Sequence, residues 1–254
     1  MKGALKRQFS FARIEDWRLE IGMIAAIIVF PRFAHRRETA MPIQFYELHI
    51  EFARMHVRSV PLERVLESLG DAVTECGRII DRAKASGSEE YVDIVVDDES
   101  DVVESLVGAA FVAAQAQISG VVSSIKRLIA RAEKDGRVLT STDGTKRGMM
   151  CHASAMIGTP PFSRIQVIDE MANFFKHHDE WTVPWSSLDK KQRPTAEIVK
   201  AIGGSEGSTG NLRLGLEALG IDCDLLRQLH DEIATWADAV IQTYAAELQA
   251  GGLL

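Results

Sequence analysis

Residues 99–135 of the chain read ESDVVESLVGAAFVAAQAQISGVVSSIKRLIARAEKD, and this stretch decides the fold class. Apolar side chains recur in it every three or four residues, the spacing of one face of an α-helix. They are Val103, Val107, Ala110, Ala114, Ile118, Val121, Ile125 and Leu128. Residues 108–114 are apolar all round and mostly small, so a neighbouring helix can approach closely. We therefore expect the central and most buried helix of a bundle.

The flanking segments also have helical periodicity. Helices are expected at residues 43–57, 61–85, 162–178, 194–202 and 222–249, with another beginning near Asn211. The Gly-, Pro- and Ser-rich segment before Asn211 forms a long connection, in which Ser208 or Thr209 is the expected helix cap. The sequence thus predicts an all-α helical bundle of about five helices, with a long central helix and one long Gly/Pro/Ser-rich connection.

Two segments beside the central helix are expected to be irregular. Tyr91–Val96 is rich in β-branched residues but has no obvious partner strand, so we expect an extended lead-in. Asp97, Asp98 and Asp101 would then mark the N-terminus of the central helix, where carboxylates meet free backbone N–H groups. Residues 136–161 contain Asp-Gly, a turn dipeptide, and are expected to form a long loop.

The N-terminus differs in charge from the remainder of the chain. The net charge is −7, but residues 1–40 carry eight Lys/Arg and four Asp/Glu, which leaves −11 for the remainder. The apolar run Ile21–Phe30 is too short to span a bilayer. We expect residues 1–40 to be a poorly packed extension and residues 41–254 to form a single helical domain. A membrane-touching anchor is the alternative for the extension.

Composition narrows the classes of function. An acidic body disfavours non-specific binding to nucleic acid, and no motif specific to DNA recognition is present. A membrane span at 99–135 is disfavoured, because Glu104, Gln115, Gln117 and Ser119 would lie in hydrocarbon. The three cysteines are widely spaced and odd in number, which favours the reducing cytoplasm.

No cofactor or metal is expected from the sequence. The glycine-rich segment 203–210 has no following Gly-Lys-Ser/Thr and no preceding strand, so it is not a phosphate loop. Cys151-His152 and His177-His178 offer zinc ligands but lack a typical spacing. The acidic tract from Glu89 to Glu104 matches no calcium loop and is expected to be a solvated helix start. Binding of a divalent cation or of a basic partner is the alternative.

The candidate site lies at the end of the 162–178 helix. Asn173 and His177 stand one helical turn apart, so both can contact one substrate group, with His177 as general acid or base. The alternative is structural: both side chains hydrogen-bond to a neighbouring helix, and protonated His177 favours the helix C-terminus.

This spacing resembles the motif of HEPN-domain proteins, in which Arg and a polar residue are followed by three variable residues and His. Asn173 matches the polar position and His177 the His, but Ala172 stands where the family has Arg. The resemblance implies a helical, metal-independent ribonuclease of toxin–antitoxin or phage-defence systems, working on RNA as a homodimer. Lys176 and Arg147 would then be the substrate-binding cations, and Arg164 is a third nearby cation that could substitute for the missing Arg if the fold brings it close. The missing Arg implies an inactive or differently used member.

Two hypotheses from different classes therefore remain. The first is a HEPN-like protein linked to RNA cleavage, with Asn173 and His177 as catalytic residues. The second is a non-catalytic helical interaction protein, in which the same two residues are structural. The missing Arg favours the second.

Overall fold

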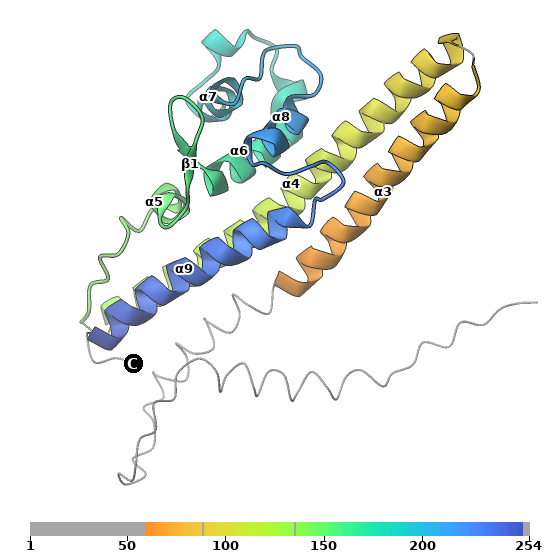
Figure 1. Ribbon diagram of the computed structural model, residues 1–254. Coiled ribbons are helices and arrows are strands. Elements are labelled where there is room, and N and C mark those ends of the chain that lie inside the picture. Colours follow the sequence, from red (N-terminus) through yellow and green to blue (C-terminus); the bar gives the residue numbers. More distant parts are fainter. Residues whose placement is uncertain (1–58, 88, 135, 251–254) are drawn as a thin grey trace, which may run out of the picture. The chain divides into compact units, whose positions relative to one another are not determined.

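The described part of the chain is a bundle of helices. The computed structural model describes residues 59–87, 89–134 and 136–250, which form seven α-helices, two short 3-10 helices and one two-stranded sheet. Figure 1 shows the helices gathered around one long central helix, as the sequence predicts. The predicted helix at 43–57 and the predicted extension at 1–40 lie outside the described residues.

Helices α3 (Ser59–Ala85) and α4 (Glu89–Lys134) form a long antiparallel hairpin. The apolar stripe of α3 packs on α4 through Leu62, Leu66, Leu69 and Val73. Val65, which the periodicity also assigns to this stripe, is instead 46% exposed. Residues 62, 66, 69 and 73 follow one line of three- and four-residue steps, and position 65 lies to one side of it.

Helix α4 begins ten residues earlier than predicted. Tyr91–Val96 is helical, so the expected extended lead-in is wrong, and Asp97, Asp98 and Asp101 lie well inside the helix. Glu89 and Glu90 occupy its first turn instead. Val92, Val95 and Val96 are partly buried on the side that faces α3. This packing outweighs the β-propensity of the segment, as tertiary contacts commonly do.

The middle of α4 is the centre of the core, as predicted. Ala110, Phe111 and Ala114 are fully buried. Gly108 permits the closest approach, because a Cβ built there would lie 2.1 Å from Cδ2 of Phe175. Among the described helices, α4 alone is long and apolar enough to cross a membrane by length and composition, and 56% of its most apolar window is buried inside the fold. The core helix of a globular protein meets the same criterion.

The predicted loop at 136–161 contains regular structure. Helix α5 (Lys146–Cys151) is capped by the Thr145 side chain, which accepts a hydrogen bond from the backbone N–H of Gly148. Strand β1 (Met156–Ile157) pairs antiparallel with β2 (Phe162–Ser163), which takes the first two residues of the predicted helix at 162–178. These elements are too short to show a period in the sequence.

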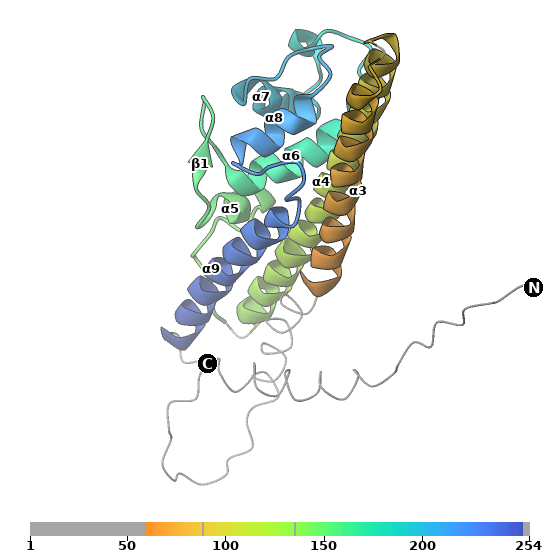
Figure 2. The ribbon, with the colours of Figure 1, turned by 45° about the vertical axis from the view of Figure 1, so that its right-hand side comes forward.

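Helix α6 (Arg164–His177) carries the candidate site and begins with a capping box. The Ser163 hydroxyl accepts from the backbone N–H of Gln166, and the Gln166 side chain accepts from the backbone N–H of Ser163. Eight residues of α6 are buried, so its position on α4 is fixed by the core. Figure 2 shows α6 and α8 beside the middle of α4.

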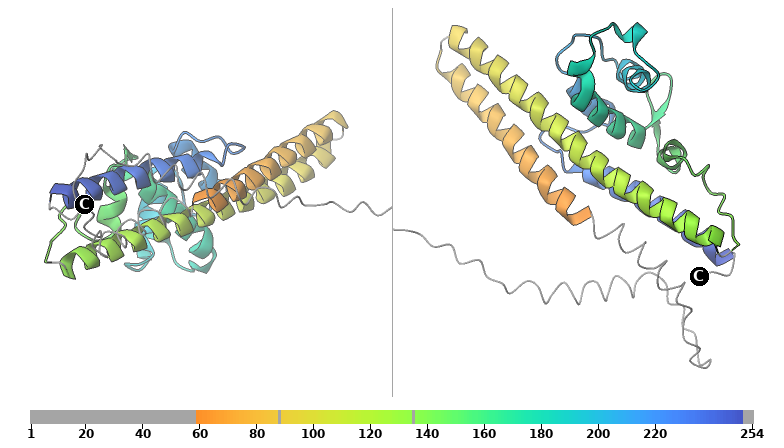
Figure 3. Two further views of the ribbon diagram at one scale, coloured as in Figure 1. Left: turned by 90° about the horizontal axis from the view of Figure 1, so that it is seen from below. Right: turned by 180° about the vertical axis from the view of Figure 1, so that it is seen from behind.

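The remaining helices are α7 (Arg193–Ala201), α8 (Asn211–Ala218) and α9 (Gln228–Ala250). The predicted caps of α8 are wrong: Gly210 takes the cap position in the left-handed region, at φ 85°. The Glu104 carboxylate of α4 instead accepts a hydrogen bond of 2.9 Å from the Leu212 backbone N–H. Helix α9 runs beside the second half of α4 (Figure 3), and its predicted apolar face is buried.

Candidate functional site

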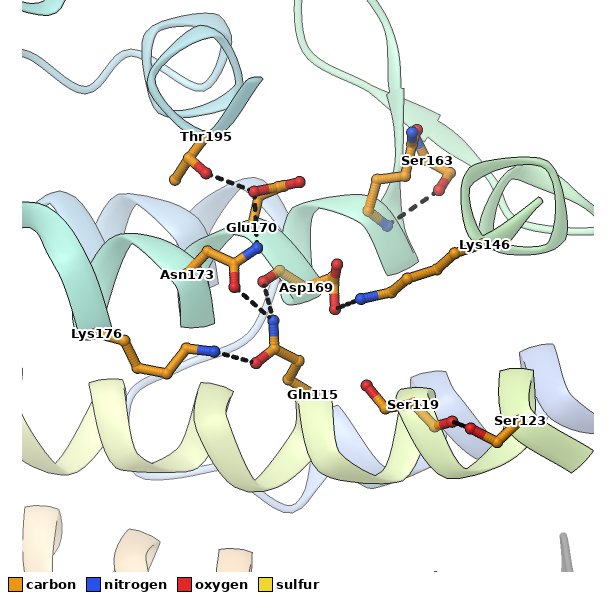
Figure 4. A network of polar contacts seen from close by, with 11 residues as sticks. Gln115, Ser119, Ser123, Lys146, Ser163, Asp169, Glu170, Asn173, Lys176 and Thr195 are labelled. Carbon is orange, nitrogen blue, oxygen red and sulfur yellow. Dashed lines mark hydrogen bonds and ion pairs between the residues drawn. The ribbon is translucent and has the colours of Figure 1, made fainter. Parts of the chain in front are cut away.

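The polar face of α6 meets a single glutamine of the apolar central helix. Nε2 of Gln115 donates to Oδ1 of Asn173 and to the backbone carbonyl of Asp169, both at 2.9 Å. Oε1 of Gln115 accepts from Nζ of Lys176 at 2.7 Å. Figure 4 shows these bonds converging on the Gln115 amide. Gln115 therefore fastens α4 to α6 through three residues of α6.

The second polar atom of Asn173 is also engaged. Its Nδ2 donates to Oε2 of Glu170 at 3.0 Å, and the same carboxylate oxygen accepts from Oγ1 of Thr195 at 2.6 Å. Thr195 lies in α7 and is buried. The network therefore runs from α4 through α6 to α7.

A buried ion pair ends the network on the other side. The Asp169 side chain is 3% exposed, and its Oδ1 lies 2.7 Å from Nζ of Lys146. Lys146 begins α5 and is 39% exposed, so its amine reaches the carboxylate from the surface. A carboxylate out of water needs such a partner, because its desolvation is costly. We refer to Gln115, Lys146, Asp169, Glu170, Asn173, Lys176 and Thr195 as the α6 network.

His177 lies apart from the α6 network. Its side chain is 50% exposed, and Nδ1 is 3.4 Å from both carboxylate oxygens of Glu180. Among the described residues, this is the polar contact that the imidazole makes. Asn173 faces α4 while His177 stands at the end of α6, so the structure does not join them around one enclosed space. Among the described helices, the predicted hydrogen bond from His177 to a neighbouring helix is not formed.

The remaining predicted cations have different positions. Arg147 follows Lys146 on α5 and is exposed. Arg164 is held by Glu232 of α9, with two nitrogen–oxygen distances of 2.8 and 2.7 Å. Lys176, although exposed, is bonded to Gln115. The structure thus brings Asn173 and Lys176 together on Gln115 and places His177, Arg147 and Arg164 elsewhere.

His178, rather than His177, is built into the fold. Its Nδ1 lies 2.9 Å from the Phe174 carbonyl oxygen, and its ring stacks on the Phe174 ring at 4.7 Å between centroids. Trp181 and Trp185 meet Phe174 edge-on, at 5.7 and 6.2 Å. These four rings hold the segment that follows α6 against the core. The signal in the sequence that could have indicated this cluster is the pair of tryptophans, Trp181 and Trp185, that follows α6.

The Cys and His side chains considered for zinc binding do not come together in the described part of the chain. Nε2 of His152 contacts the Thr243 hydroxyl of α9 at 3.0 Å, away from His177 and His178. Within residues 59–87, 89–134 and 136–250, no group of three or more His, Cys, Asp or Glu side chains is arranged to hold a metal ion. The chemistry available at α6 is therefore that of hydrogen bonds, one buried ion pair and one exposed imidazole.

Comparison with known proteins adds no assignment. No protein-family model, no curated protein and no solved structure matches this chain.

Proposed function

We propose that this chain is a non-catalytic helical interaction protein, in which Asn173 is structural and the HEPN-like motif is degenerate. The observation that carries the proposal is that both polar atoms of the Asn173 amide already have a partner within the fold. Its oxygen is bonded to Gln115 and its nitrogen to Glu170. To bind a substrate group, Asn173 would have to give up its bond to buried Gln115 or to partly buried Glu170, and an unpaired buried group costs about 1–3 kcal/mol.

The position that the HEPN motif gives to Arg supports the same proposal. Ala172 is fully buried, and its neighbours Met171 and Phe174 are core residues. An arginine at this position would point into packed apolar side chains, not toward a phosphate in solution. The position of the missing Arg is therefore closed by core packing, so restoring the Arg would not by itself restore a phosphate-binding site.

The charge near His177 also fits binding to something other than RNA. The charged groups that contact the two histidines at this helix end are Glu180, which contacts His177, and Asp179, which contacts His178. Carboxylates repel the phosphates of an RNA backbone. Lys146, which directly precedes Arg147 on α5, already forms an ion pair with Asp169.

The test is an RNA-cleavage assay on purified protein, with single-stranded and duplex RNA and without added metal. We expect wild type and His177→Ala to give the same background, and both to match a heat-denatured sample. Cleavage that disappears in His177→Ala, while the melting temperature stays the same, would overturn the proposal. His152→Ala is the matched control, since that imidazole contacts Thr243 instead.

The second candidate is the HEPN-like ribonuclease acting on RNA as a homodimer in the cytoplasm. One observation favours it: half of the His177 side chain is open to solvent, beside exposed Lys176. A second copy would have to supply the cation that position 172 lacks. Sedimentation velocity tests this candidate, which requires a dimer whose RNA cleavage depends on His177.

A further inference from the structure

The turn end of the α3–α4 hairpin extends beyond the other described helices. Figures 1 and 3 show this end projecting away from α6 to α9. The first buried residue of α4 is Val107, and none of the residues from Glu89 to Leu106 is buried. The hydrogen bond from the Leu212 backbone N–H to the Glu104 carboxylate marks where α4 first meets α8. We call residues 71–105 the outer hairpin.

One face of α4 in the outer hairpin is apolar and exposed. Val92, Val95 and Val96 face α3 and are partly buried. Beside this face, along one side of α4, Tyr91, Ile94 and Val102 are 52%, 55% and 45% exposed.

Tyr91, Ile94, Asp98 and Val102 follow steps of three, four and four residues, so they form one line along the helix. We call these four residues the outer stripe. At a rise of about 1.5 Å per residue it is roughly 16 Å long, the length of three helical turns.

The charge around the outer stripe is strongly negative. Residues 71–105 contain eleven Asp/Glu and three Lys/Arg, a net charge of −8. Two of the three cations, Arg78 and Arg82, are paired with Glu75 at 3.1 and 2.9 Å. Asp97 and Asp101 lie beside the stripe, on the side turned away from α3, and are exposed. An apolar line bordered by carboxylates is complementary to a helix with an apolar face bordered by Lys and Arg.

We propose that the outer stripe binds an amphipathic, basic helix of a partner protein, packed alongside α4. Ile94 and Tyr91 supply the apolar contact, and Asp97, Asp98 and Asp101 supply the charge. A second copy of this chain is disfavoured as occupant, because it would bring two outer hairpins of −8 together. An anionic membrane surface is repelled for the same reason. The proposal rests on the proposed function and names the class of partner.

The experiment measures binding of two labelled 18-residue helical peptides to the full chain by fluorescence anisotropy. Both peptides have the same leucine face, and the flanking residues are Lys in one and Glu in the other. We expect the Lys peptide to bind and the Glu peptide not to bind. Non-specific attraction of a basic peptide to an acidic protein would also give this result. Variants must therefore separate the apolar contact from the charge attraction.

Ile94→Ser removes the apolar contact and keeps every charge. We expect it to raise the Kd of the Lys peptide at least tenfold, and Asp97→Asn with Asp98→Asn to do the same. Val138→Ser is the matched control, because Val138 is 76% exposed and lies outside the outer hairpin; its Kd should equal that of wild type. Circular dichroism checks that each variant keeps its helices.

Three results would overturn the proposal: equal binding of both peptides, an unchanged Kd in Ile94→Ser, or a wild-type dimer that Ile94→Ser converts to monomer. The last would identify a second copy as the occupant. None of them bears on Asn173 and His177, whose non-catalytic role is decided by RNA cleavage. Failure here and failure of the proposed function are therefore distinguishable.

Discussion

Gln115 and Asn173 are joined by a hydrogen bond of 2.9 Å between their side-chain amides, across the interface of α4 and α6. Gln115 lies in the most apolar part of α4 and is 9% exposed. The same amide also binds Lys176 and the Asp169 carbonyl. A buried polar group is tolerated when all its bonds are made and costly when they are not. The pair therefore fixes how α6 sits on α4.

We expect Gln115→Ala to lower the free energy of unfolding more than Asn173→Ala, each by about 1–3 kcal/mol. Gln115→Ala leaves the Lys176 amine and the Asn173 oxygen without their partner. After Asn173→Ala, Gln115 still bonds Asp169 and Lys176. A double-mutant cycle by urea unfolding should give a coupling free energy of about 0.5–3 kcal/mol. Strict additivity would show that the contact contributes nothing.

The two adjacent histidines should respond oppositely to truncation. His177→Ala should change the free energy of unfolding by less than about 0.5 kcal/mol, since the imidazole is half exposed and its contact with Glu180 is long. His178→Ala removes a stacked ring and a bond to Phe174, so we expect a loss of about 1–2 kcal/mol. Urea unfolding of both variants measures this. An equal loss in the two would contradict the placement of His177.

Long periodic segments were predicted well from sequence. The buried faces of α4 and α9 follow from apolar residues at helical spacing, and Val107, Ile118, Trp236 and Tyr244 are all in the core. Short elements were missed because tertiary contacts define them. Strand β2, for example, contains Ser163, whose hydroxyl donates a hydrogen bond to the Met150 carbonyl oxygen. Nothing local in the sequence encodes that bond.

The contacts of the candidate site could not be predicted from helical spacing. That spacing placed Asn173 and His177 on one side of α6, whereas the structure joins Asn173 and Lys176 to a shared partner about sixty residues earlier in α4. The one clue was Gln115 itself, a polar residue in the apolar middle of a core helix. Such a residue needs a partner, yet the sequence does not say which helix provides it.

Acid should weaken the attachment of α9 to the 136–145 connection through Glu247. Burial alone would raise the pKa of Glu247, but hydrogen bonds from the hydroxyls and backbone N–H groups of Ser141 and Thr140 outweigh it and lower the pKa below its ordinary value. A carboxyl with a lowered folded pKa stabilises the fold above its unfolded pKa, and that stabilisation is lost as pH falls through the folded pKa.

We therefore expect the free energy of unfolding to decline more steeply in wild type than in Glu247→Gln between about pH 5 and 3. Urea unfolding at a series of pH values gives the slopes. Glu197→Gln, which changes an exposed carboxylate of α7, is the control and should keep the wild-type slope. Parallel slopes for Glu247→Gln and wild type would show that the Glu247 bonds do not form in solution.

Cys76 should be the least reactive thiol of the three. Burial raises the pKa of Cys76 to about 11, and the hydrogen bond and charge of Glu99 act in the same direction. At pH 8 only about one thiol in a thousand is then ionised, and the thiolate is the reactive form. Iodoacetamide labelling followed by peptide mass spectrometry should modify Cys151 well before Cys76.

Glu99, the α4 residue that interacts with Cys76, provides a control. Glu99→Gln removes the negative charge, so the pKa of Cys76 should fall and its labelling should accelerate. The raised pKa also predicts that this thiol stabilises the fold below its ordinary pKa, and that this contribution is lost as pH rises toward 11. Equal labelling of Cys76 in folded and urea-unfolded protein would contradict its burial.

Glycine-to-alanine substitutions should have opposite effects in the two helices of the hairpin. Alanine favours a helix interior by about 1 kcal/mol over glycine. At Gly77 of α3, a Cβ would meet nothing within 4 Å, so Gly77→Ala should stabilise the protein by up to that amount.

At Gly108 of α4, the Cβ would lie 2.1 Å from the Phe175 ring, and overpacking of this kind costs about 1–3 kcal/mol. Gly108→Ala should therefore destabilise the protein, and adding Phe175→Ala should cancel the clash and leave only the loss of the ring. The melting temperatures of these three variants and of wild type measure this, and a stabilising Gly108→Ala would mean that α6 does not approach α4 as closely as the structure shows.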